Sequence, residues 1–164
     1  LLYVSNKIFI HLLKTKWTMQ NFKTLKEQVI QWGLEKGINK PVTQFCKVSE
    51  ELDEINKELS SKEELNLNKL KDAIGDTAVT LILLNYQEGR VSMLSDMKIL
   101  DIKGPKVAFR QIFIAVAQND NRVFYMLNDL AMYFGSTLEE CLQIAYDVIS
   151  KRTGQTINGQ FYKD

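Results

Sequence analysis

The stretch PVTQFCKVSEELDEINKEL, residues 41–59, decides the fold class. Pro41 opens it, at a position in the first helical turn where the missing N–H of proline costs little. The apolar residues then recur at intervals of three and four, which is the spacing of one face of an α-helix. They are Phe45, Val48, Leu52, Ile55 and Leu59. The stretch therefore predicts an amphipathic helix that packs its apolar stripe against other elements.

The segments on both sides also predict helices. The preceding residues 22–32 have a helical apolar pattern, and Gly33 and Gly37 end it. After the central stretch, Ser61 and Glu64 have the spacing of a capping box, in which each residue's side chain bonds the other's backbone N–H. We therefore expect a third helix that begins near residue 61.

The second half of the chain continues the pattern. Residues 78–84 are almost wholly apolar, which is typical of a helix that neighbours cover on every side. Pro105 opens a fourth helix, residues 119–121 interrupt it, and residues 123–134 resume it. Residues 89–104 are expected to form a looser connection between the third and fourth helices.

The last helix is predicted by a second capping box, Ser136 with Glu139, and by the apolar periodicity that follows it. The tail after Thr153 contains glycine and is expected to be irregular. We expect one all-α, bundle-like domain over residues 19–164.

Residues 1–18 precede the first methionine, Met19, and are interpreted as an N-terminal extension outside the functional unit. Their apolar run, residues 8–13, is much shorter than the roughly 20 residues needed to cross a bilayer. His11, the single histidine, lies within this extension, so we do not expect it to be catalytic.

Composition excludes several function classes. A formal net charge of +1 gives no general reason to bind nucleic acid or an anionic membrane. Two cysteines, Cys46 and Cys141, exclude a disulfide scaffold and suit a reducing cytoplasm, so we expect a cytoplasmic protein. One histidine excludes zinc sites and triads that need several imidazoles. Any catalysis must use carboxylates, lysines and arginines.

The central helix carries an unusual run of acids on one side. By helical geometry its glutamates fall within an arc of about 100° beside the apolar stripe: they are Glu50, Glu51, Glu54 and Glu58. Like charges four residues apart repel by roughly 0.2–0.5 kcal/mol per pair. The arc is therefore either a cation site or an ordinary solvated face that Lys47 and Lys57 partly neutralise.

Asp76 favours the cation site. It lies in the apolar part of the third helix, where a carboxylate must be neutral, paired or bound to a metal. Asp72 is one turn earlier on the same face, and pairing with Lys69 is the structural alternative. Gly75 lets a ligand or another helix approach closely. Carboxylates from two helices in one gap would suit Mg²⁺ or Mn²⁺, which usually bind substrate phosphates as well.

These residues resemble a known family. The run Glu50-Glu51-Leu52-Asp53-Glu54 is similar to the Glu-Glu-x-x-Glu signature of the all-α nucleoside triphosphate pyrophosphohydrolases, the MazG-like superfamily. Ile74-Gly75-Asp76 resembles its second motif, Glu-x-x-Asp, although the glutamate position is Ala73 here. The closest resemblance is to small phage-type members, which also have the pattern of the C-terminal residues 152–161.

The resemblance implies a helical bundle completed by oligomerisation, as a homodimer or homotetramer. It also implies metal-dependent cleavage of a (d)NTP between the α and β phosphates, to (d)NMP and pyrophosphate, with Mg²⁺ or Mn²⁺ as cofactor. The residue roles expected from it are Glu50, Glu51 and Glu54 as catalytic; Glu51, Glu54, Asp76 and Asp72 as metal-binding; Lys151, Arg152 and Trp32 as substrate-binding. Phe22 and Phe45 are further candidates for a base pocket. The alternative is a non-catalytic nucleotide-binding or helical interaction protein of the same fold.

Overall fold

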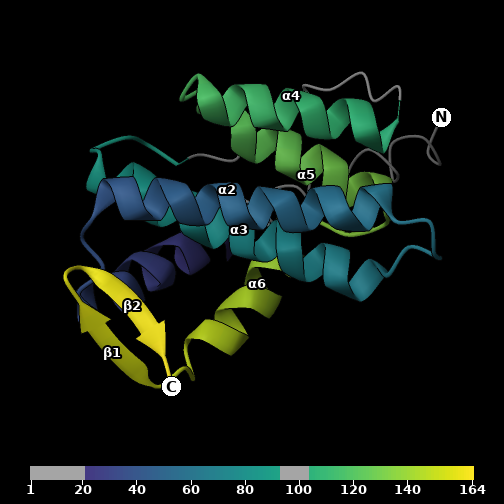
Figure 1. The fold of residues 1–164 in the computed structure, drawn as a ribbon. Coiled ribbons are helices and arrows are strands. Elements are labelled where there is room, and N and C mark those ends of the chain that lie inside the picture. The colour runs from purple at the N-terminus through teal and green to yellow at the C-terminus, as the bar shows by residue number, and fades with distance from the viewer. Residues whose placement is uncertain (1–20, 93–103) are drawn as a thin grey trace, which may run out of the picture.

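The chain is mostly helical in a computed structural model that describes residues 21–92 and 104–164 (Figure 1). Residues 1–18 lie outside the described part, and so does the expectation for His11. Residues 21–35 are helical, and the later elements are α2 (Pro41–Ser60), α3 (Leu67–Gln87), α4 (Pro105–Ala117), α5 (Val123–Tyr133), α6 (Leu138–Ile149), β1 (Gly154–Ile157) and β2 (Gln160–Lys163). The predicted predominance of helices is confirmed.

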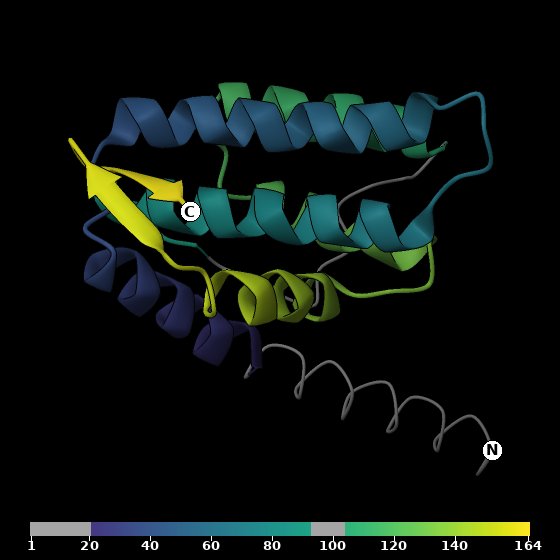
Figure 2. The same cartoon turned by 60° about the horizontal axis from the view of Figure 1, so that its bottom comes forward.

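Helix α3 is the centre of the bundle. Figure 2 shows α2, α3 and α6 in three successive rows, with α4 behind α2 and the helix at residues 21–35 beside α6. The prediction that residues 78–84 are covered on every side is confirmed, since all seven are buried. None of the helices within the described residues is long and apolar enough to cross a membrane.

Gly75 lies where α3 and α6 approach each other closely. A Cβ atom at this position would collide with the backbone carbonyl of Cys141 and lie 3.0 Å from the Cβ of Ala145. The close approach expected at Gly75 is therefore made by a helix rather than by a ligand. It places the first two turns of α6 against the helix that carries Asp76.

Both predicted capping boxes are wrong in position. Helix α3 begins at Leu67, because the side chain of Asn66 accepts from the N–H groups of Asn68 and Lys69, both at 3.1 Å. Ser61 instead accepts from the N–H of Glu63 within the preceding loop.

In α6 the capping box consists of Thr137 and Glu140, one residue later than predicted. The hydroxyl of Ser136 donates to the same Glu140 carboxylate at 2.7 Å, so it supports the cap from outside.

The tail that was expected to be irregular forms an antiparallel hairpin. Strands β1 and β2 are joined at Asn158 and Gly159, whose φ angles are 53° and 80°. Two successive positive φ angles are typical of a type I′ turn, and Asn-Gly is its favoured pair. The hairpin lies beside the start of α2, where the N–H of Asn39 donates to the carbonyl of Gly159 at 3.2 Å (Figure 1).

Candidate functional site

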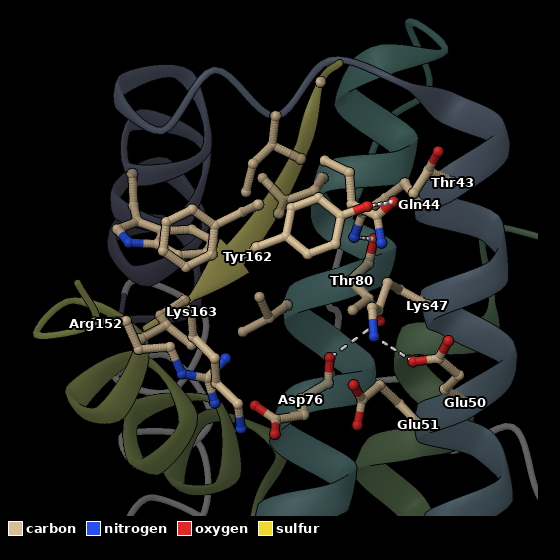
Figure 3. A pocket seen from close by; sticks show the side chains of 18 of the residues that line it. Thr43, Gln44, Lys47, Glu50, Glu51, Asp76, Thr80, Arg152, Tyr162 and Lys163 are labelled. Atoms are coloured by element: carbon tan, nitrogen blue, oxygen red, sulfur yellow. Dashed lines mark hydrogen bonds and ion pairs between the residues drawn. The ribbon is translucent and has the colours of Figure 1, made fainter. Parts of the chain in front are cut away.

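A cavity of about 550 Å³ lies between α2, α3 and the C-terminal hairpin (Figure 3). Helix α2 contributes its acidic face, and α3 contributes Asp76 among apolar side chains. The end of α6 and the hairpin form the opposite wall. The lining residues are Trp32, Ile38, Thr43, Gln44, Lys47, Glu50, Glu51, Glu54, Asp76, Val79, Thr80, Leu83, Ile149, Arg152 and residues 159–163.

A buried side-chain amide links α2 to α3. Gln44 is only 6% exposed, and its Nε2 donates to the backbone carbonyl of Thr80 at 3.2 Å. The two helices follow one another through a short loop and run in opposite directions (Figure 1). Glu51, two turns after Gln44 on α2, and Asp76, one turn before Thr80 on α3, both line the cavity.

The carboxylates in this gap repel one another. Burial, followed by the negative charges of Asp76 and Glu54, raises the pKa of Glu51 from 4.5 to about 7. Burial, followed by the charge of Asp72, raises the pKa of Asp76 from 3.8 to about 6, while Arg152 opposes the rise. Acids with shifted pKa values in a cleft are typical of functional sites, because such sites use burial and like charges to adjust the pKa values of their reactive groups.

Glu50 differs from its neighbours because it is paired. Its carboxylate forms an ion pair with Lys47, one turn earlier on α2. The ammonium of Lys47 also lowers the pKa of Glu51, although the acidic neighbours and burial outweigh it. Glu50 is thus exposed and paired at the edge of the cavity, whereas Glu51 is half-buried in the cavity wall.

The donor set suits a hard divalent cation, although the side chains do not converge on one point. Among the described residues, no three Asp, Glu, Cys or His side chains are arranged to hold a metal ion. Glu51, Glu54 and Asp76 nevertheless share the cavity, and the charges of Glu54 and Asp76 raise the pKa of Glu51. Carboxylate oxygens are the ligands that Mg²⁺ and Mn²⁺ prefer, and a cation among them would remove the repulsion.

Basic and aromatic groups face these acids across the cavity. Figure 3 shows the side chain of Arg152 directed toward Asp76, with Lys163 beside it. Tyr162 lies farther along the cavity, toward Thr43 and Gln44. The cavity therefore has acidic side chains on one wall, and basic and aromatic side chains on the opposite wall. This arrangement suits a metal-bound anion that is attached to an aromatic group.

Six of the residues expected from the sequence to form the site lie around this cavity: Trp32, Glu50, Glu51, Glu54, Asp76 and Arg152. Four others lie elsewhere. Asp72 is exposed and acts on Asp76 only through its charge, and the side chain of Lys151 is exposed outside the cavity. Phe22 packs against Phe124 in the core at a ring distance of 5.8 Å, and Phe45 is 44% exposed.

Ala73, at the position of the second-motif glutamate in the resembling family, is only 3% exposed and does not line the cavity. Trp32 is 8% exposed and lies edge-on to Phe161 at 5.9 Å, so it contributes a buried wall rather than an open stacking platform.

The hairpin residues were missed by sequence reasoning. Tyr162 and Lys163 line the cavity, but they come from a tail that was expected to be irregular. The Asn158-Gly159 pair between alternating residues was the available signal, since that dipeptide strongly favours a two-residue hairpin turn.

Comparison with known proteins assigns no family: no family model matches the chain, and no curated protein or solved structure matches it either.

Proposed function

We propose that this protein is a metal-dependent nucleoside triphosphate pyrophosphohydrolase of the MazG-like type, which cleaves (d)NTPs between the α and β phosphates. The observation that supports the proposal best is the shared cavity of Glu51, Glu54 and Asp76, in which burial and neighbouring carboxylates raise the pKa values of Glu51 and Asp76. Above these pKa values, a cluster of this kind destabilises the protein unless a cation compensates it. The motif resemblance supplies the reaction.

The residues of the acidic wall divide into two roles. Glu51, Glu54 and Asp76 would hold Mg²⁺ or Mn²⁺, which when bound neutralises phosphate charge and lowers the pKa of a water. Glu50 is at the edge of the cavity, where Lys47 fixes its position. We assign Glu50 as the acceptor of the proton from the attacking water.

The residues of the opposite wall bind the substrate. The guanidinium of Arg152 faces Asp76 and carries the planar donor set that suits phosphate oxygens (Figure 3). Lys151 is exposed outside the cavity, so we do not expect it to bind the substrate, and its substitution serves as a control.

Product analysis tests the reaction. We expect pyrophosphate and a nucleoside monophosphate in the presence of Mg²⁺, with the oxygen of ¹⁸O-labelled water in the monophosphate, because attack at the α phosphate places it there. Glu54→Gln and Asp76→Asn should each abolish turnover and leave a folded protein. Full turnover in both variants would refute the assignment of the site.

The second candidate function is a nucleotide-binding protein of the same fold without activity. Two observations favour it: the carboxylates do not converge on one point among the described residues, and Ala73 leaves the second motif without its glutamate. Turnover distinguishes the two functions, since a binding protein would be stabilised by Mg²⁺ and nucleotide without releasing pyrophosphate.

We also propose that the protein is a homodimer or homotetramer. Apolar side chains on α4 are exposed in the single chain, among them Phe113 at 55% and Ile114 at 53%. Neighbouring exposed apolar residues are typical of protein contacts. Light scattering after gel filtration should give twice or four times the mass of one chain, and the mass of one chain would contradict the proposal.

A further inference from the structure

The C-terminal hairpin is attached to the protein away from the carboxylates. Thr156 donates its hydroxyl to the backbone carbonyl of Lys36, and Gly159 accepts from the N–H of Asn39 at 3.2 Å. The ammonium of Lys36 lies 5.3 Å from the ring centre of Phe161. All of these contacts join the hairpin to the segment between the first described helix and α2, so the acidic wall is not needed to hold the hairpin in place.

The far end of β2 reaches the cavity without a fixed partner for its charge. Lys163 and Tyr162 both line the cavity and both are exposed, Tyr162 at 49%. Within the described parts of the chain, Lys163 forms no ion pair. An ammonium group beside an arginine, facing carboxylates that it does not touch, is suited to an anion placed between the two walls.

The order of the side chains along the cavity matches the order of parts in a nucleotide. Figure 3 shows Lys163 and Arg152 at the end nearest Asp76, and Tyr162 toward Gln44. A phosphate chain would therefore lie beside the basic pair, and the base would lie under the tyrosine ring. Stacking on an aromatic side chain tolerates any base because every base has a π-face.

We propose that the C-terminal hairpin is the nucleotide-recognition element of this protein, with Lys163 binding the phosphate chain and Tyr162 stacking on the base. The inference rests on the proposed function for the class of ligand, but not for turnover. It assigns metal binding to α2 and α3 and nucleotide binding to the hairpin, and these two affinities can be measured separately.

The experiment compares Lys163→Gln and Tyr162→Leu with the wild-type protein and with Lys151→Gln as the matched control. Calorimetric titration with the α,β-methylene analogues of dATP, dCTP, dGTP and dTTP, in Mg²⁺, measures nucleotide binding without hydrolysis. Electron paramagnetic resonance of Mn²⁺ without nucleotide measures metal binding. We expect about tenfold weaker analogue binding in both hairpin variants, because each loses one charge-assisted hydrogen bond or one stacking contact. Mn²⁺ affinity should not change.

Lys163→Arg should restore analogue binding, because it keeps the charge, whereas Lys151→Gln should bind as the wild type does. Analogue binding at the wild-type level in both Lys163→Gln and Tyr162→Leu would overturn the inference, and so would a wild-type protein that binds none of the analogues. Analogue binding that depends on the hairpin, without pyrophosphate release from natural nucleotides, would support the inference and refute the proposed enzyme function. Pyrophosphate release with unchanged KM in both variants would support the proposed enzyme function and refute the inference.

Discussion

The substitution Glu51→Gln should make the protein more stable than the wild type without metal and less stable than the wild type with metal. Glu51 is an acid whose pKa in the folded state is raised from 4.5 to about 7, so folding favours its protonated form. The cost of ionising it in the folded state is absent below the unfolded pKa, grows as the pH rises, and is complete above the folded pKa. Glutamine has nearly the same shape and carries no charge, so it removes that cost.

The magnitude follows from the same values. One pKa unit corresponds to about 1.4 kcal/mol, so a rise from 4.5 to about 7 corresponds to about 3.5 kcal/mol before screening. Glu51 is half-buried and faces the cavity, so solvent screens part of this energy. We therefore expect Glu51→Gln to increase the free energy of unfolding by about 1–2 kcal/mol near pH 8. Most of the gain should disappear near pH 5.

The assay is urea unfolding at both pH values, first with EDTA and then with saturating Mg²⁺. A ligand at about 100 times its Kd stabilises the native state by about 2.7 kcal/mol, and the variant should lose most of that gain because it lacks one metal ligand. The order of stability should thus reverse when the metal is added. Glu58→Gln, on the same helix outside the cavity, should change stability by less than about 0.5 kcal/mol at either pH.

The reasoning would be refuted if Glu51→Gln destabilised the protein in EDTA near pH 8. It would also be refuted if Mg²⁺ stabilised the variant and the wild type equally.

Three further substitutions test the packing around the site. Gly75→Ala should destabilise the protein by about 1–3 kcal/mol, because the new Cβ meets the backbone carbonyl of Cys141. Thermal unfolding measures this loss. A more stable variant would mean that α3 and α6 are farther apart. Gln44→Ala should lower the free energy of unfolding by about 1–2 kcal/mol and weaken Mn²⁺ binding, because the hydrogen bond to Thr80 helps to align α2 and α3. Unchanged Mn²⁺ affinity would show that this bond does not position the carboxylates. Ala73→Glu should lower the free energy of unfolding, measured in urea, by more than about 2 kcal/mol, because this position is 3% exposed. A stable variant with faster pyrophosphate release would place residue 73 in the site instead.

The parts of the fold that could be predicted from the sequence are those set by local periodicity. The apolar spacing of α2 and the wholly apolar stretch of α3 each depend on a few neighbouring residues, and both predictions agree with the structure. Phe45 fits the same spacing but is exposed, because the adjacent Gln44 takes the inward position and one residue turns the helix by about 100°. Periodicity alone did not distinguish these two neighbours.

The candidate site could be predicted only on its acidic side. Glu51, Glu54 and Asp76 lie on two consecutive helices, so helical geometry was enough to place them in one gap. Lys163 and Tyr162 reach the same cavity from the end of the chain, through a hairpin whose docking depends on contacts with residues 36–40. No local pattern in the sequence encodes that long-range contact.

The central claim is that the acidic cavity supports hydrolysis of a nucleoside triphosphate to pyrophosphate. The most direct test is pyrophosphate release from a panel of canonical and modified NTPs and dNTPs, measured with Mg²⁺, with Mn²⁺ and with EDTA. We expect release from at least one nucleotide with either metal, and none in EDTA or in the Asp76→Asn variant. A folded protein that binds Mg²⁺ and releases no pyrophosphate from any nucleotide would contradict the claim.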